Sequence, residues 1–333
     1  MRAIVMGTGP IGGIIGGRLA RAGHDLTFVD VDREHVAAIR DHGLQVDVPD
    51  GPFNVSVPIV FPDEIEGTFD AAFVAVRCNY TSDTLATALP HLSDGALVVS
   101  MQNGINVPLL EEAVGADRSV GMGIRMGSRR VAPGHVHTTT RGHLYVGHSH
   151  GRTTPRLEEL NAMLDAVIPS EITDNIIGVL WSKLTYTCYG YYGSLANTSM
   201  VESCASPEDR LLLADFLGEV VAVGTAAGAR FIPLREYNPP DLHPDKPAEA
   251  RTAIVNGYAE SWRSDDLKGP LRQLLTGSKL EVAFTLGHVV RESARLGLST
   301  PLCDNLLQMM LDLESGKRQL GLHNYAELGA CRT

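Results

Sequence analysis

The first two dozen residues limit the fold more than any other part of the chain. Arg2 to Met6 have the apolar character of a buried strand, and the glycine-rich hexapeptide GTGPIG follows directly at residues 7–12. The next residues, up to Gly23, carry small and apolar side chains at helical spacing, which predicts a helix that a glycine ends. A glycine turn between a strand and a helix is typical of a dinucleotide-binding domain.

Each glycine of this turn has its own physical task. Gly7 permits the tight turn, Gly9 lets the backbone approach a pyrophosphate, and Gly12 allows the helix to contact the strand closely. The helix N-terminus adds free N–H groups and a partial positive charge. We therefore expect cofactor contacts from the whole turn, which comprises Gly7, Thr8, Gly9, Pro10, Ile11 and Gly12. Three further glycines make the following helix thin and predict unusually close packing on it: Gly13, Gly16 and Gly17.

An acidic residue after the second strand discriminates between the two nicotinamide cofactors. The strand from Asp25 to Val29 is followed by Asp30, which lies 18 residues beyond Gly12. A carboxylate here accepts hydrogen bonds from the adenosine ribose and repels a 2′-phosphate, so Asp30 favours NAD over NADP. Arg33 keeps NADP open, because an arginine at this place can pair with that phosphate. Asp32 is expected to cap the next helix.

Two residues of the first half lie where ligands bind in a parallel sheet. Phe69 to Val76 form a predicted buried strand followed by Arg77, and Ala96 to Ser100 form another, followed by Met101, Gln102 and Asn103. Ligands bind outside the carboxyl ends of such strands, so Arg77 and Asn103 are candidate contacts; the alternative is that they only cap loops. Three later segments are expected to extend the sheet in antiparallel fashion, namely Ser119 to Met126, His135 to Thr139 and His143 to Gly147.

The second half is predicted to be helical and contains an unusual lysine. From about Asp174 a long helical segment without other charges carries Lys183 near its centre. A lysine removed from water is costly unless it is paired, so Lys183 is a candidate proton donor. The alternative is a side chain that extends along the helix to reach solvent.

Composition and charge narrow the possible partners. The net charge is −11 and no basic tract occurs, which argues against binding to nucleic acid or to an anionic membrane. No run approaches the roughly 18 apolar residues of a membrane helix, and the N-terminus has no signal-peptide pattern, so we expect a cytoplasmic protein.

The five cysteines form neither a disulfide framework nor a zinc motif, and Cys188 is expected to pack in a core. His135 and His137 lack a third ligand at fixed spacing, so no metal is expected.

Taken together, these motifs resemble the ketopantoate reductases, more broadly the 2-dehydropantoate 2-reductase-like dehydrogenases. The resemblance spans nearly the whole chain. It rests on the glycine turn, on Arg77, on MQNG at 101–104, on LWSKL at 180–184, and on LEVAFTLGHVVRESARLGLSTP at 280–301. It implies a doubly wound Rossmann α/β domain over residues 1–172 and an all-α domain over 173–333, with a cleft for NAD and substrate between them and a homodimer as the assembly.

The resemblance also implies roles for individual residues. Lys183 corresponds to the catalytic general acid, and Asn103 would lie between cofactor and substrate. Arg77 stands where the family usually has a lysine close to the cofactor. Glu281 matches the acidic residue that faces the nicotinamide ribose and the substrate hydroxyl; near Lys183 it would favour the ammonium form of that lysine. A solvated helix carboxylate is the alternative for Glu281.

The departures from the family pattern concern the substrate. Asparagines are usual four and eight residues after the lysine, whereas this chain has Thr187 and Tyr191, which we keep as candidate substrate contacts. Gly269 stands in place of a serine and Gln273 in place of an aspartate. The tyrosines Tyr186, Tyr189, Tyr191 and Tyr192 suggest a larger or more apolar ligand, unless they simply pack in the core.

These observations predict an oxidoreductase that acts on a small molecule. The expected reaction is reversible hydride transfer between NAD(H) and a ketone or secondary alcohol, with a 2-oxo or 2-hydroxy acid other than pantoate as substrate. Three alternatives remain: genuine 2-dehydropantoate reduction, reduction of an imine as in opine-type enzymes, and a sensor that binds NAD(H) without catalysis. Retention of Lys183 and Glu281 argues against the sensor, which needs no proton donor.

Overall fold

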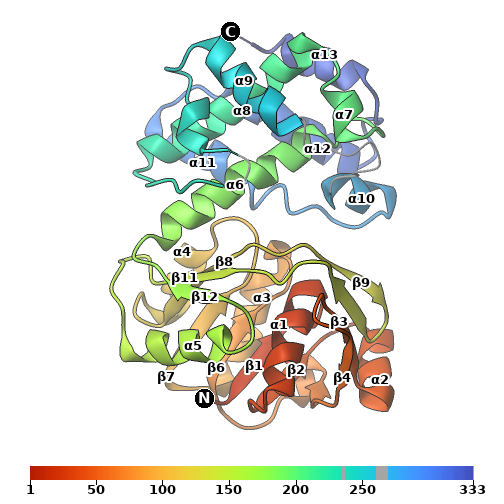
Figure 1. Ribbon diagram of the computed structural model, residues 1–333, viewed down its shortest axis with the longest axis vertical. Helices are drawn as coiled ribbons and strands as arrows, with labels where there is room; N and C mark the ends of the chain where they lie inside the picture. Colours follow the sequence, from red (N-terminus) through yellow and green to blue (C-terminus); the bar gives the residue numbers. More distant parts are fainter. Residues whose placement is uncertain (235–236, 260–268, 333) are drawn as a thin grey trace. The chain divides into compact units, whose positions relative to one another are not determined.

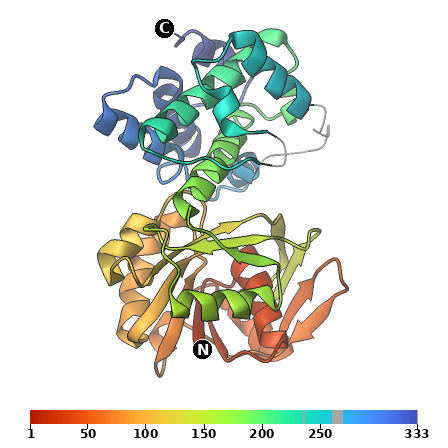
Figure 2. The same cartoon turned by 60° about the vertical axis from the view of Figure 1, so that its left-hand side comes forward.

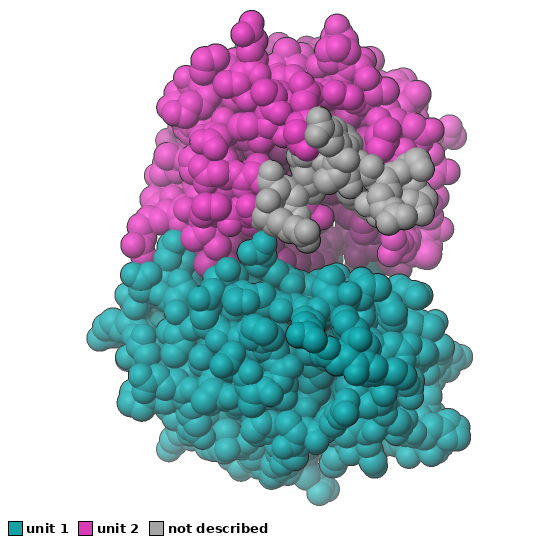
Figure 3. Space-filling model, in the orientation of Figure 1, with its two compact units in different colours: residues 1–102, 106–176 teal, residues 103–105, 177–333 magenta. Residues whose placement is uncertain are grey.

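The computed structural model describes residues 1–234, 237–259 and 269–332 (Figure 1). Internal contacts divide the chain into two compact units, which Figure 3 colours separately. Unit 1 comprises residues 1–102 and 106–176, and unit 2 comprises residues 103–105 and 177–333. This division falls four residues after the boundary expected from the sequence, and it assigns the short loop at 103–105 to unit 2.

Unit 1 is built on an eight-stranded sheet with the order β12-β11-β8-β7-β6-β1-β2-β5. The strands from β5 to β8 in this order are parallel, β11 runs antiparallel to β8, and β12 runs parallel to β11. The predicted Rossmann-type α/β class is therefore confirmed, and β11 supplies the antiparallel extension. The segment at 119–126 was also expected to be antiparallel, and this was wrong, because β8 pairs in parallel with β7. The strand bounds are β1 Ala3–Met6, β2 Leu26–Val29, β5 Ile59–Val60, β6 Phe69–Val74, β7 Leu92–Ser100, β8 Ser119–Ile124, β11 Leu144–Gly147 and β12 Ser170–Ile172.

A second, four-stranded sheet corrects one expectation. Its order is β4-β3-β10-β9, with bounds β4 Phe53–Val55, β3 Leu44–Asp47, β10 His135–Thr138 and β9 Ser128–Ala132. The segment at 135–139 was expected to extend the large sheet, and this was wrong, because β10 pairs in parallel with β3 and antiparallel with β9. Its side chains alternate between partly exposed and buried, which is typical of a strand with only one covered face.

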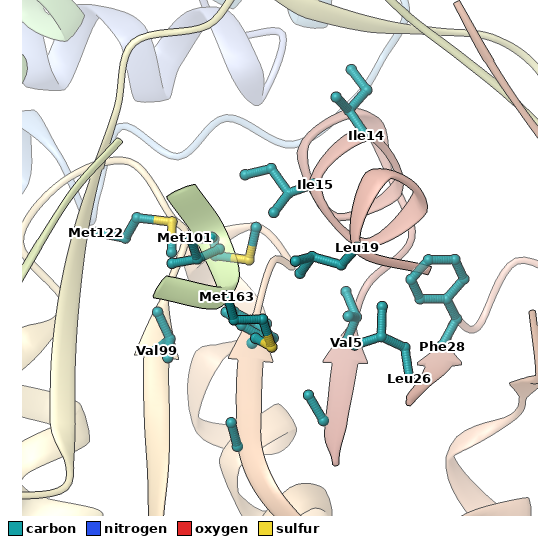
Figure 4. Packing of buried hydrophobic residues seen from close by; sticks show 14 of the residues in the cluster. Val5, Ile14, Ile15, Leu19, Leu26, Phe28, Val99, Met101, Met122 and Met163 are labelled. Atoms are coloured by element: carbon teal, nitrogen blue, oxygen red, sulfur yellow. The ribbon is translucent and has the colours of Figure 1, made fainter. Parts of the chain in front are cut away.

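Helices cover both faces of the large sheet. Along β6, Ala71 and Phe73 join the core on one face, whereas Ala72 and Val74 contribute to clusters on the other face. Figure 4 shows the first core, in which Leu19 of helix α1 lies beside the strand that carries Val5. Helix α5 lies across the sheet in both ribbon views (Figures 1 and 2). The helices are α1 Pro10–Arg21, α2 Arg33–His42, α3 Thr81–Ala88, α4 Val107–Val114 and α5 Pro155–Asp165, with short 3₁₀ turns at Pro62–Glu64, Cys78–Tyr80 and Leu89–His91.

Helix α1 lies between the two sheets because its glycines occupy opposite sides. A Cβ added at Gly16 would overlap the ring of Phe28 on the large sheet. A Cβ added at Gly17 would lie 3.0 Å from Val46 of the small sheet, and one at Gly13 would lie 3.2 Å from Val136. The expected close packing of this helix is confirmed, and it fixes the position of the glycine turn that precedes it.

Unit 2 consists, in its described residues, of helices and the loops that join them. Three of the four tyrosines flagged in the sequence pack in its core, since Tyr189, Tyr191 and Tyr192 are at most 3% exposed. Tyr186 is 43% exposed. Core packing therefore accounts for most of this cluster. The helices are α6 Ile176–Tyr192, α7 Met200–Ser203, α8 Pro207–Ala226, α9 Ala248–Ala259, α10 Gly269–Leu275, α11 Leu286–Leu296, α12 Pro301–Glu314 and α13 His323–Gly329, with a 3₁₀ turn at Pro239–Leu242.

Candidate active site

Two glycines of the turn in unit 1 are required by the packing of the protein itself. Gly7 has φ +95°, a left-handed conformation that favours glycine, and an added Cβ would lie 3.0 Å from Val76. A Cβ on Gly12 would overlap the carbonyl oxygen of Gly7 and lie 2.9 Å from the side chain of Ala75. Both positions hold the start of α1 tightly against the ends of β1 and β6.

Gly9 differs from its neighbours because nothing surrounds its Cβ position. Its φ is −63°, which other residues also adopt, and an added Cβ would meet no atom of the described residues within 4 Å. Gly9 is the N-cap of α1, and no side chain in the described part of the chain caps the helix there. The open space at Gly9 thus lies at the N-terminus of α1, where the free N–H groups that follow Pro10 suit an anion such as a pyrophosphate. The turn fits the dinucleotide that the sequence implies.

Asp30 lies at the end of β2 and holds the glycine turn. Its Oδ2 accepts hydrogen bonds from the backbone N–H of Thr8 at 2.8 Å and from the Thr8 hydroxyl at 2.9 Å. Its Oδ1 accepts one from the N–H of Asp32 at 3.0 Å. A carboxylate offers about four acceptor positions, so Asp30 retains capacity for the hydroxyls of a ribose.

Two arginines near Asp30 have contacts of their own. Asp32 caps α2 by accepting from the N–H of His35 at 3.1 Å, as expected, and it also forms an ion pair with Arg130 at 2.6 Å. The hydrogen bond from Arg130 lowers the pKa of the Asp32 carboxyl below its usual value. The guanidinium carbon of Arg33 lies 5.7 Å from the centre of the Phe61 ring. Arg33, the residue that left NADP possible as the cofactor, thus lies over the Phe61 ring in this structure.

Arg77 and a buried glutamine follow the ends of β6 and β7. Arg77 is exposed and comes directly after Val76, which borders Gly7. Gln102, only 4% exposed, donates hydrogen bonds to the Val76 carbonyl at 3.0 Å and to the Thr81 hydroxyl at 2.8 Å. It thereby holds the segment between β6 and α3. Gln102 was not predicted from the sequence, although its position directly after a buried strand, within MQNG, could have indicated a role at the end of the sheet.

In unit 2, helix α6 presents Lys183, Thr187 and Tyr191 along one face. The spacing of four residues places them one turn apart, with Lys183 and Thr187 partly buried and Tyr191 3% exposed. The Thr187 hydroxyl donates to the backbone carbonyl of Lys183 at 3.1 Å. Its hydrogen is therefore used by its own helix, which leaves Thr187 as an acceptor for any ligand.

A chain of hydrogen bonds within unit 2 joins three of the residues predicted from the sequence. The Thr285 hydroxyl donates to the Glu281 carbonyl at 2.9 Å, so the Tyr191 hydroxyl, 2.7 Å away, is the donor to Thr285. Asn103 donates from Nδ2 to a carboxylate oxygen of Glu281 at 3.3 Å. Thr285 is fully buried and was not predicted, because its role depends on a partner 94 positions away.

The remaining candidates for chemistry have packing or ionic partners. Cys188 is fully buried, and burial raises the pKa of its thiol far above the usual value, so it is protonated and unsuited to nucleophilic attack. His135 bonds to Asp47 at 2.7 Å, and His137 lies 3.8 Å from the same carboxylate. Within the described ranges, no group of three or more His, Cys, Asp or Glu is arranged to hold a metal ion. None of the described helices is long and apolar enough to span a bilayer.

Comparison with known proteins identifies the family. The model described as "Ketopantoate reductase PanE/ApbA" matches residues 3–151, and "Ketopantoate reductase PanE/ApbA C terminal" matches residues 175–314. The chain belongs to the ketopantoate reductase family. The resemblance noted in the sequence is thereby confirmed, and membership makes the chain a nicotinamide-dependent dehydrogenase or reductase that acts on CH–OH groups.

Individual members of the ketopantoate reductase family match over nearly their full lengths. The 2-dehydropantoate 2-reductase of Halobacterium salinarum is 27% identical over 314 residues, 93% of this chain and 98% of that protein. The crystal structure of a family member from Ralstonia eutropha superposes with a TM-score of 0.81 at 24% identity and covers 96% of this chain and all of that one. A D-mandelate dehydrogenase with NADH and anilino(oxo)acetate gives 0.81 at 18% identity, covering 95% and 99%. The two structures support the fold.

Proposed function

We propose that this ketopantoate reductase family member transfers hydride reversibly between NAD(H) and a 2-oxo or 2-hydroxy acid other than pantoate, with Lys183 as general acid and base. The observation that carries the proposal is the hydrogen bond between Asn103 and Glu281, residues 178 positions apart. It brings together two side chains for which the sequence resemblance implied roles beside the reacting groups. Lys183 is on α6 of the same unit.

The proposed chemistry follows from the side chains of unit 2. Hydride delivery by a bound nicotinamide turns a ketone into an alkoxide, which must gain a proton as it forms. The ammonium group of Lys183 supplies that proton and stabilises the developing charge; in the opposite direction the neutral amine removes it. We propose that the Glu281 carboxylate lies near the Lys183 ammonium group and helps to keep it charged. Asn103 holds that carboxylate through its amide.

The side chains near Lys183 favour a substrate other than pantoate. Thr187 donates its hydrogen to its own helix and Tyr191 donates to Thr285, so neither supplies the amide donors that asparagines provide at these positions. Tyrosine is also far bulkier and more apolar than asparagine. A protein of similar fold, the D-mandelate dehydrogenase, was crystallised with a ligand that joins an oxoacetate group to an aromatic ring. We therefore propose a 2-oxo acid with a sizeable apolar substituent.

Asp30 supports NAD as the cofactor. Its carboxylate lies at the end of β2 and keeps acceptor capacity after holding Thr8 and Asp32. Such a group accepts from the ribose hydroxyls of NAD, whereas it repels the 2′-phosphate of NADP. The homodimer expected from the sequence stays a prediction, which light scattering coupled to size-exclusion chromatography tests.

The test is reduced-nicotinamide absorbance with a graded panel of 2-oxo acids. The panel runs from pyruvate through branched aliphatic acids to phenylglyoxylate and includes 2-dehydropantoate, each with NADH and with NADPH, and with and without ammonia or a primary amine. We expect turnover without amine, faster with NADH, and a larger kcat/KM for an apolar acid than for 2-dehydropantoate. Fastest turnover of 2-dehydropantoate would make the chain a genuine 2-dehydropantoate 2-reductase. Turnover only with amine would make it an imine reductase, and NADH binding without any turnover would support the sensor.

A further inference from the structure

A buried histidine connects the glycine turn to the small sheet. His35, on α2, has no exposed surface, and both of its ring nitrogens contact backbone atoms. The N–H of Gly134 donates to Nδ1 at 2.9 Å, so Nδ1 carries no hydrogen. The hydrogen is therefore on Nε2, which donates to the carbonyl oxygen of Thr8 at 2.9 Å. The surroundings thus select one tautomer of the neutral ring.

This contact completes a set of bonds around Thr8. Asp30 accepts from the N–H and from the hydroxyl of Thr8, while His35 donates to its carbonyl oxygen. The peptide that contains this carbonyl also contains the N–H of Gly9, the residue whose Cβ position is open. A trans peptide is planar, so its C=O and N–H point in opposite directions. Holding the Thr8 carbonyl therefore fixes the direction of the Gly9 N–H.

The far side of the histidine is itself held in place. Gly134 has φ +71°, and a Cβ there would lie 3.0 Å from Ala38 of α2, so the turn between β9 and β10 lies directly against the helix. At its N-terminus, α2 is capped by Asp32, whose own N–H donates to Asp30. The imidazole therefore spans two fixed backbone segments, 8 and 134, that are remote in sequence.

We propose that His35 is a positioning residue for the cofactor. By holding the Thr8 carbonyl it aims the Gly9 N–H at the space beside the N-terminus of α1, where a pyrophosphate would accept that hydrogen. This role rests on the proposed binding of NAD(H). It assigns to a fully buried imidazole an effect on cofactor affinity that its contribution to packing alone would not produce.

Two substitutions of similar size each remove one of the two hydrogen bonds of His35 and keep the other. In His35→Asn the short side chain keeps an acceptor near the Nδ1 position for Gly134 but does not reach Thr8. In His35→Gln the longer side chain places an amide N–H near the Nε2 position and keeps the donor to Thr8. The full chain is titrated with NADH by fluorescence, KM for NADH and kcat are measured, and thermal unfolding is followed without cofactor.

We expect His35→Asn to raise the Kd and the KM for NADH about three- to tenfold, the effect of one lost hydrogen bond, with kcat at saturating NADH unchanged. His35→Gln should stay within about twofold of the wild type, although both variants lower the unfolding temperature by similar amounts. An unchanged Kd in His35→Asn, or equal increases in both variants, would show a purely structural histidine and overturn the proposal.

A measurement on the wild type covers the case in which His35→Asn does not fold. Nitrogen-15 NMR of histidine-labelled protein reports the tautomer of His35 and the exchange rate of its ring proton. The proposal expects the Nε2–H tautomer, with slower exchange of that proton when NADH is added. The other tautomer, or exchange that NADH leaves unchanged, would contradict it. Failure of the wild type to bind NADH at all would instead overturn the proposed function, and the role of His35 with it.

Discussion

The glycine turn of unit 1 and the lysine helix of unit 2 are built by different means. In the glycine turn, the groups held in place belong mainly to the backbone: Gly12 has no room for a Cβ, and the N–H and carbonyl of Thr8 are held by Asp30 and His35. Around the lysine helix, positions depend on side-chain hydroxyls and amides, such as the chain from Tyr191 through Thr285 to Glu281. A site formed by backbone groups tolerates few residue types, whereas a site formed by side chains changes when those side chains are substituted. The sequence therefore indicates the class of cofactor but does not identify the substrate.

The largest expected effect tests the chemistry assigned to the lysine helix. Lys183→Ala should lower kcat by about 10²–10⁴-fold, because a positioned proton donor contributes that much, while the Kd for NADH stays near that of the wild type. Stopped-flow absorbance measures the first quantity and fluorescence titration the second. Lys246→Ala, at a half-exposed lysine of unit 2, is the control and should leave both unchanged. A Lys183→Ala enzyme with wild-type kcat would show that the acid is another group.

The next effect separates the two kinds of glycine in the turn. Gly12→Ala should lower the free energy of unfolding by about 1–3 kcal/mol or more, because its Cβ meets the rigid carbonyl of Gly7. Gly9→Ala should change the free energy of unfolding by less than about 0.5 kcal/mol, since its Cβ meets no described atom within 4 Å and its φ suits alanine. NADH binding should nevertheless weaken at least about tenfold in Gly9→Ala, through loss of the space for pyrophosphate. Urea denaturation measures the free energies of unfolding, and NADH titration measures the affinities. If Gly9→Ala binds NADH as tightly as the wild type, the pyrophosphate lies elsewhere.

A smaller effect concerns the cofactor preference. Asp30→Asn removes the charge that accepts from Thr8 and, as proposed, from the ribose, so the Kd for NADH should rise about tenfold. The Kd for NADPH should rise less or fall, because repulsion of its phosphate is lost. Asp32→Asn is the matched control: it weakens a partly exposed ion pair with Arg130, asparagine still caps α2, and the preference for NADH should stay. Equal preferences in Asp30→Asn and the wild type would contradict the role of Asp30.

The smallest effect distinguishes positioning from packing in unit 2. Tyr191→Phe and Tyr192→Phe each remove one buried hydroxyl that donates a hydrogen bond, the first to Thr285 and the second to the carbonyl of Asp209. Each should lower the free energy of unfolding by about 1 kcal/mol. Only Tyr191→Phe should also lower kcat/KM, by a few fold, since Thr285 holds the backbone of Glu281. Equal values of kcat/KM in the two variants would show that Tyr191 contributes only to core packing.

The sequence predicted the features that depend on residues close together in the chain, and it missed those that depend on residues far apart in the chain. The strand, turn, helix and Asp30 of the cofactor region were foreseen because they are close in sequence and each step is local. The small sheet was missed because β3 and β10 pair across about 90 residues with no local signal. His35 and Thr285 were missed for the same reason, since their partners lie 27 to 99 and 94 positions away. Tyr191 was predicted as a substrate contact, and only the structure reveals that its hydroxyl hydrogen is donated to Thr285.

The central claim is that hydride passes directly from the nicotinamide to the C2 carbon of a 2-oxo acid. NADH carrying deuterium at one or the other face of C4 is incubated with the best acid of the panel, and the product is analysed by mass spectrometry. The account predicts that one of the two labelled forms, and only one, yields a 2-hydroxy acid heavier by one mass unit, with the deuterium on C2. Product that carries no deuterium from either form, while NADH is consumed, would contradict it.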